Sequence, residues 1–93
     1  MSVDPNEKPF LPRGVRLHFD KVRDDWVLLA PERAIRLDDI GLAILNELDG
    51  ERSLSMIATS LAEKYGAPAD QVATDCVEFL QSLVDRRFVE LRQ

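Results

Sequence analysis

Apolar and polar residues alternate in short segments near the start of the chain. Apolar residues fall on every second position over residues 15–20, and this period predicts a half-buried strand. Residues 26–29 form a short apolar run that Pro31 must break. Residues 33–37 alternate again, with Ala34 and Arg36 on one face and the other three on the opposite face. Three such segments in succession predict an antiparallel meander in which residues 33–37 form an edge strand.

The period then changes to that of helices. Asp38 can cap a helix whose apolar positions recur at three to four residues, and Gly50 can close it. Ser53 can cap a second helix that ends at Gly66, and Pro68 suits the first turn of a third. The short connection gives the last two helices the spacing of a helix-turn-helix. We therefore expect an α+β fold, a small winged-helix-like domain with a three-stranded antiparallel sheet followed by three helices.

The two ends of the chain carry weaker patterns. Residues 1–9 contain two prolines, two acidic residues and few apolar residues, so we expect them to form a flexible arm. A single domain would then span residues 10–93. Residues 88–91 alternate, which fits a short C-terminal strand or a packed tail.

The predicted third helix has a wide apolar face. At 100° per residue its apolar residues cover an arc of about 160°, whereas docking on one core needs only roughly 100°. Their order around the helix is Phe79, Val72, Leu83, Cys76, Leu80, Ala73, Val84, Val77. One edge of this helix should therefore keep apolar surface to spare.

The charge balance argues against nucleic acid as a partner. The chain has 12 Lys and Arg against 17 Asp and Glu, a net charge of −5, so phosphate backbones gain no long-range attraction. Residues 70–85 contain four acidic residues and no Lys or Arg, so the third helix would repel DNA. A winged-helix DNA-binding transcriptional regulator is nevertheless the alternative that the architecture suggests.

Residues suited to enzyme chemistry are few. The single histidine, His18, falls on the polar face of a predicted strand, and the single cysteine, Cys76, falls on an apolar helix face where a thiol is inert. We find no phosphate-binding loop and no metal-ligand motif, and therefore expect no enzyme activity, no metal and no cofactor.

One cysteine fits a reducing compartment, and no apolar run approaches the ~20 residues of a membrane span. We therefore expect a cytoplasmic protein with no membrane partner.

An exposed edge strand beside an apolar helix strip is the arrangement that recognises peptides by strand addition. The edge backbone would pair with the added strand, while Arg33 and Arg36 would favour acidic residues in it. Alternatively, the strip belongs to the core and the two arginines only protect the edge. In a third interpretation the same edge serves dimerisation.

Four short blocks resemble a known family. They are Leu-Pro-Arg-Gly-Val-Arg-Leu at 11–17, Trp-Val-Leu-Leu-Ala-Pro-Glu-Arg at 26–33, Leu-Asp at 37–38 and Asp-Gly at 49–50. In this order they resemble the pyrroloquinoline quinone (PQQ) biosynthesis protein D family, PqqD. The resemblance implies a chaperone that binds a ribosomally made precursor peptide and presents it to a radical S-adenosylmethionine (radical SAM) enzyme. That enzyme crosslinks a glutamate and a tyrosine within the peptide.

The resemblance also implies a site. In this family the leader of the precursor is thought to add as a strand to the third strand, beside the third helix. Carried over to this sequence, the peptide-binding residues are Arg33, Ala34, Ile35, Arg36, Leu37, Ala73, Cys76, Val77, Leu80 and Val84. The family pattern does not fix which edge of the helix lines the groove.

Two further expectations concern the edge strand. Ile35→Pro should abolish peptide binding by removing a backbone donor and disturbing the strand. We expect a monomer, although the Ala30-Pro31-Glu32 corner can act as a hinge for strand exchange between protomers.

Overall fold

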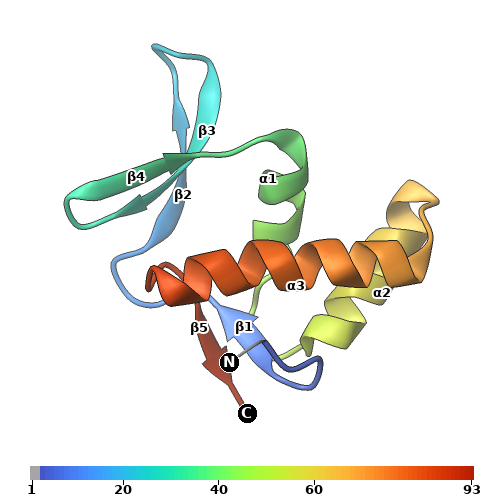
Figure 1. The fold of residues 1–93 in the computed structure, drawn as a ribbon. Helices are drawn as coiled ribbons and strands as arrows, with labels where there is room; N and C mark the ends of the chain where they lie inside the picture. The colour runs from blue at the N-terminus through green and yellow to red at the C-terminus, as the bar shows by residue number, and fades with distance from the viewer. Residues whose placement is uncertain (1–2) are drawn as a thin grey trace.

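The structure, a computed structural model, describes residues 3–93 as two small sheets and three helices (Figure 1). The elements in chain order are β1 (Lys8–Phe10), β2 (Arg16–Asp20), β3 (Asp25–Ala30), β4 (Arg33–Arg36), α1 (Asp39–Leu45), α2 (Leu54–Tyr65), α3 (Ala69–Asp85) and β5 (Glu90–Arg92). In Figure 1, α3 crosses in front of α1 and α2, with the three-stranded sheet above its C-terminal end and the two-stranded sheet below. The predicted α+β class is confirmed, as is a three-stranded sheet followed by three helices, whereas β1 was not predicted.

The three-stranded sheet is an antiparallel meander with the order β2-β3-β4, so β4 is an edge strand as the alternation predicts. Ile35 and Leu37 pack against the hydrophobic core, whereas Ala34 and Arg36 are exposed. The assignment of faces along this strand is therefore confirmed.

Local capping fixes most helix boundaries. The side chain of Asp38 accepts a backbone N–H in the first turn of α1, and that of Ser53 does the same for α2. Gly66, with a φ of 64°, ends α2 as predicted. α1 is shorter than expected, because it ends at Leu45 and not near Gly50. The amides of Glu47 and Leu48 bond to carbonyls three residues back, at Ile44 and Leu45, which tightens the chain and ends the α-helix.

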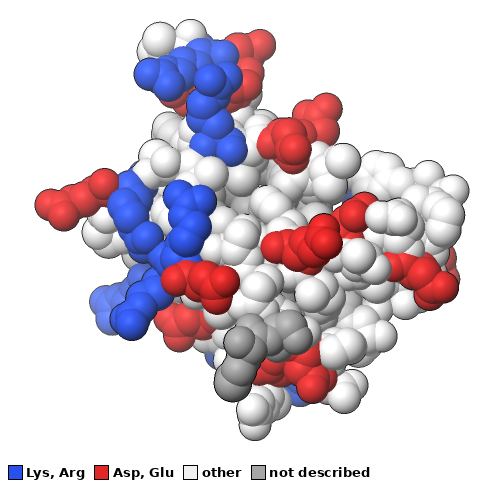
Figure 2. All heavy atoms as spheres, viewed as in Figure 1, with Lys and Arg blue, Asp and Glu red and all other residues white. Residues whose placement is uncertain are grey.

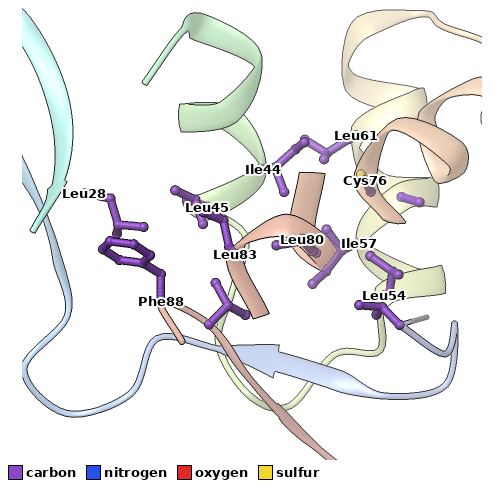
Figure 3. Close-up of a cluster of buried hydrophobic side chains, with 13 residues drawn as sticks. Leu28, Ile44, Leu45, Leu54, Ile57, Leu61, Cys76, Leu80, Leu83 and Phe88 are labelled. Carbon is purple, nitrogen blue, oxygen red and sulfur yellow. The ribbon is translucent and has the colours of Figure 1, made fainter. Parts of the chain in front are cut away.

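The core lies between the three-stranded sheet and the helices. Leu28 of β3, Ile57 of α2, Leu80 of α3 and Phe88, which follows α3, have no exposed surface. Figure 3 shows these side chains approaching one another from separate elements. Burying each such side chain contributes about 1.5–3 kcal/mol, so this cluster holds the sheet and the helices together.

The N-terminal segment packs onto the domain. Val3 is part of the core and only 4% exposed, and β1 pairs antiparallel with β5. The carbonyl of Glu7 accepts the N–H of Leu54, and that of Pro5 accepts the N–H of Ser55, which satisfies donors at the start of α2. The flexible arm predicted for residues 1–9 is therefore wrong for residues 3–9; the first two residues lie outside the described part. Burial of Val3 and the hydrogen bonds to α2 offset the entropy lost when residues 3–9 become ordered. Both are contacts with distant parts of the chain, so the composition of the segment does not reveal them.

Candidate functional site

The outer edge of β4 carries backbone groups that do not pair within the sheet. The N–H of Leu37 donates to the carbonyl of Trp26 at 3.0 Å, which fixes the alternation of bonds along this strand. Ile35, two residues earlier, therefore also pairs inward with β3. The N–H and C=O groups of Ala34 and Arg36 point away from β3 in consequence. An added strand would bond to these outward groups.

β4 lies beside the C-terminal end of α3, and α1, which follows β4, packs against α3. At the start of β4, the guanidinium of Arg33 donates to the carbonyl of Arg86 at 2.6 Å and lies 4.2 Å from the centroid of the Phe88 ring. Just beyond the end of β4, Gly41 in α1 approaches Phe79 of α3 so closely that a Cβ there would lie 3.0 Å from the ring. A strand added to β4 would therefore run over the surface of α3.

α3 buries the middle of its apolar face and leaves both edges half-buried. Cys76 and Leu80, at the middle, are 1% and 0% exposed. Val72 and Phe79 lie on one edge, and Ala73, Val77 and Val84 lie on the other. Spare apolar surface is therefore present on both edges and not on one alone.

The two edges of α3 face different parts of the molecule. Ala73 and Val77 line a groove of about 280 Å³ together with Pro5 and the start of α2. On the other edge, Val72 lines a pocket of about 370 Å³ with residues of α1, and Phe79 contacts the first turn of that helix. Because α1 directly follows β4, the edge with Val72 and Phe79 continues the surface beside the edge strand.

The structure brings together only part of the predicted site. Arg33–Arg36 do form the edge strand, beside the end of α3, and Leu37 directly follows it with its N–H bonded to the carbonyl of Trp26. Leu80 is corrected, because the core covers it and it is 0% exposed. Cys76 is 1% exposed, and the little surface it keeps lines a pocket with residues of α1 that includes no residue of β4.

The remaining helix residues of the prediction lie on the edge away from β4. Ala73 and Val77 face the N-terminal segment and α2, and Val84 shares their side of the helix. Val72 and Phe79, which the prediction did not include, lie on the other edge and face α1. Both residues belong to the predicted apolar arc. A helical wheel, however, does not show which edge of the helix faces α1 and which faces the N-terminal segment.

Both arginines of β4 already have partners. The guanidinium of Arg36 lies 2.6 Å from the carboxylate of Asp25 in an exposed ion pair, which contributes about 0–1 kcal/mol. In Figure 2, basic residues gather over β4 and the C-terminal end of α3, where Arg33, Arg86 and Arg87 are exposed. Acidic residues lie over the start of α1 and the middle of α3. The surface beside β4 therefore has a basic end and an acidic end.

The single cysteine has the environment of an inert thiol. Burial raises the pKa of Cys76 to about 11, and the neighbouring carboxylate of Asp75 adds to this effect.

Within residues 3–93, no group of three or more His, Cys, Asp or Glu side chains is placed to hold a metal ion. In the same range, no helix has both the length and the apolar character needed to cross a bilayer.

Comparison with known proteins connects this fold to one family. The family model described as Coenzyme PQQ synthesis protein D (PqqD) matches residues 25–89, which include β3, β4 and all three helices. A PqqA binding protein from Rhizobium meliloti is 54% identical over 83 residues, covering 89% of this chain and 85% of the relative. Another PqqA binding protein, from Xanthomonas euvesicatoria, is 45% identical over 90 residues, covering 97% of this chain and 98% of the relative.

Two solved structures are similar over nearly the whole chain. One is the solution NMR structure of the PqqD truncation of Methylobacterium extorquens PqqCD, described as a functional and stand-alone recognition element for ribosomally synthesised and post-translationally modified peptides. It has a TM-score of 0.82 and 42% identity, covering 96% of this chain and 95% of that one. The other is a crystal structure of PqqD from Xanthomonas campestris, with a TM-score of 0.60 and 42% identity, covering 94% and 97%. From the family match and these relatives, the chain belongs to the PqqD family.

Proposed function

We propose that this protein is a non-enzymatic adaptor of PQQ biosynthesis that binds a PqqA precursor peptide by adding it as a strand to β4. The observation that carries the proposal is the unpaired outer edge of β4 beside a half-buried apolar edge of α3. The relatives named PqqA binding protein support the choice of ligand, and the recognition-element description of the Methylobacterium extorquens structure supports the mode of action.

Backbone and side chains have separate roles in this binding mode. The outward groups of Ala34 and Arg36 form hydrogen bonds with any extended peptide, each with a net contribution of about 0.5–1.5 kcal/mol. Alternate side chains of the peptide then contact Ile35, Leu37 and Phe79, which are only partly buried by the domain itself. The backbone bonds provide affinity, and these apolar contacts fix the register of the peptide.

The adaptor would act before a separate enzyme. A peptide held on β4 by its leader leaves the rest of its length free, so the complex can present that part to a radical SAM enzyme, as the family resemblance implies. The single cysteine favours the cytoplasm as the compartment of this step. DNA is disfavoured as a ligand because the exposed face of α3 carries Asp70, Asp75 and Glu78 and no basic residue.

A proline scan of β4 tests strand addition directly. The N–H of Ile35 points into the sheet, so Ile35→Pro would break the bond to β3 and damage the fold. Ala34→Pro is the sharper variant, because it removes an outward N–H and a proline is tolerated on the solvent side of an edge strand. Ala34→Val keeps the N–H and serves as the matched control.

We expect Ala34→Pro to weaken binding of a synthetic Rhizobium meliloti PqqA peptide about two- to tenfold, the loss of one such hydrogen bond, while Ala34→Val binds like the parent protein. Isothermal titration calorimetry gives the Kd, and a backbone amide NMR spectrum of each variant verifies the fold. A folded Ala34→Pro protein with the parent affinity would refute strand addition at β4.

A further inference from the structure

A second apolar surface lies beyond the end of β4, where the three helices meet. The pocket there has a volume of about 370 Å³. Its apolar walls come from all three helices and include Ile40, Ala43 and Ile44 of α1, Leu61 and Tyr65 of α2, and Val72 and Cys76 of α3. This volume is within the range of sites that bind small apolar groups.

Large apolar side chains are exposed at the rim of this pocket. Ile40 is 67% exposed and Tyr65 is 62% exposed, so both leave much apolar area in contact with water. Clustered exposure of this kind is typical of a surface that a partner covers. The ammonium nitrogen of the neighbouring Lys64 lies 5.8 Å from the centroid of the Tyr65 ring.

The charged residues of the pocket are both acidic. Asp39 and Asp75 line it, and no Lys or Arg does. Asp75 accepts a hydrogen bond from the side chain of Gln71 at 2.9 Å. Within residues 3–93, neither carboxylate belongs to any of the ion pairs. A ligand that covered the two carboxylates with neutral or acidic groups would remove their water without replacing it by an attractive contact. A ligand with an apolar group in the pocket and a cation beside it therefore fits best.

The pocket lies past the end of the proposed peptide path. Asp39 comes two residues after Leu37, and Phe79 lies on the same edge of α3 as Val72, between the pocket and the contacts of β4 with α3. A peptide paired with β4 therefore reaches the pocket by extending past the end of the strand.

We propose that this pocket holds an apolar side chain of the bound precursor peptide, and that a Lys or Arg next to it in the peptide pairs with Asp39 and Asp75. The inference rests on the proposed function, because the same peptide must be held by β4. The precursor peptide would therefore contact the protein in a second region, through an apolar residue that adjoins a basic residue in the peptide sequence.

The four isoleucines of the chain provide separate reporters for the two regions. Ile35 lies on β4, Ile40 and Ile44 line the pocket, and Ile57 is a fully buried core residue. In a titration of methyl-labelled protein with the Rhizobium meliloti PqqA peptide, we expect Ile35, Ile40 and Ile44 to shift while Ile57 stays in place. A shift of Ile35 alone would overturn the pocket proposal and keep strand addition. If none of the three moved, both proposals would fail.

Two substitutions test the pocket chemistry by calorimetry. Ala43→Leu adds volume to the pocket wall and should weaken binding at least fivefold. Asp75→Asn removes one carboxylate and should weaken binding about two- to fivefold, with the difference lost at high salt. The control is Glu78→Gln, an exposed change on the same helix away from the pocket, which should leave the Kd unchanged. Parent affinity in both pocket variants would refute the proposal even if the isoleucine methyls shift.

Discussion

The thiol of Cys76 shows how burial determines the chemistry of a single residue. Its pKa rises from the ordinary 9.0 to about 11 because the folded chain removes it from water. The apolar position of Cys76 on the helix was enough to predict an inert, buried thiol. Its place in the pocket between the three helices, and not beside the edge of β4, was not predictable, because the packing of the neighbouring helices decides which part of the apolar arc they cover.

This shift makes stability depend on alkaline pH. Below pH 9 the thiol is protonated in both states, so it adds no pH dependence. Between pH 9 and about 11 the unfolded chain loses this proton while the folded chain keeps it, so the free energy of unfolding falls as pH rises.

We expect urea unfolding at pH 8, 9.5 and 10.5 to show a steeper loss of stability for the parent protein than for Cys76→Ala. Other groups that titrate in this range are common to both proteins, so the difference isolates the thiol. Parallel curves for the two proteins would contradict the assigned pKa. In the native state at pH 8, Cys76 should also react with a thiol reagent far more slowly than in urea.

At the scale of elements, the β3–β4 turn contains a strained residue. Ala30 pairs with Arg33, so the turn consists of Pro31 and Glu32 alone. Glu32 has a φ of 62°, in the left-handed region where glycine is favoured. The same corner is the hinge expected for strand exchange, and opening it would release the strain.

Glu32→Gly should therefore raise the free energy of unfolding by about 0.5–1 kcal/mol and hold the protein as a monomer. Urea unfolding measures the first effect and analytical ultracentrifugation the second. Glu51→Gly, at an exposed loop residue whose φ is not positive, should bring no gain. A loss of stability in Glu32→Gly would show that the turn is not strained.

The sequence predicted those elements whose boundaries depend on interactions between neighbouring residues. The caps at Asp38 and Ser53 and the end at Gly66 follow from hydrogen bonds within a few residues, and all three were predicted. β1 was not predicted, because it has only three residues and pairs with β5 at the opposite end of the chain. The position of the pocket depends in the same way on how three separate helices meet.

For the whole molecule, the N-terminal segment is a structural part of the domain. Val3 is in the core, and the carbonyls of Pro5 and Glu7 accept N–H groups at the start of α2. Losing this segment would expose apolar core surface and leave those donors without their partners.

Deletion of residues 1–7 should therefore lower the free energy of unfolding by about 3–5 kcal/mol, and Val3→Ala alone by about 1–2 kcal/mol. Asn6→Ala, at an exposed position, is the matched control and should change stability by less than about 0.5 kcal/mol. Urea unfolding followed by circular dichroism measures all three. Equal stability of the deletion variant and the parent would restore the view of a dispensable arm.

The antiparallel pairing of β1 with β5 places the two ends of the described chain side by side, below α3 in Figure 1 and away from β4. Lys8 is the partner of Arg92 in this pairing. The chain is therefore suited to circular permutation, with a short linker closing the present ends and new ends opened in the exposed loop at residues 21–24. By the same geometry, a domain fused to either end would emerge from one side of the molecule and leave the peptide-binding edge uncovered.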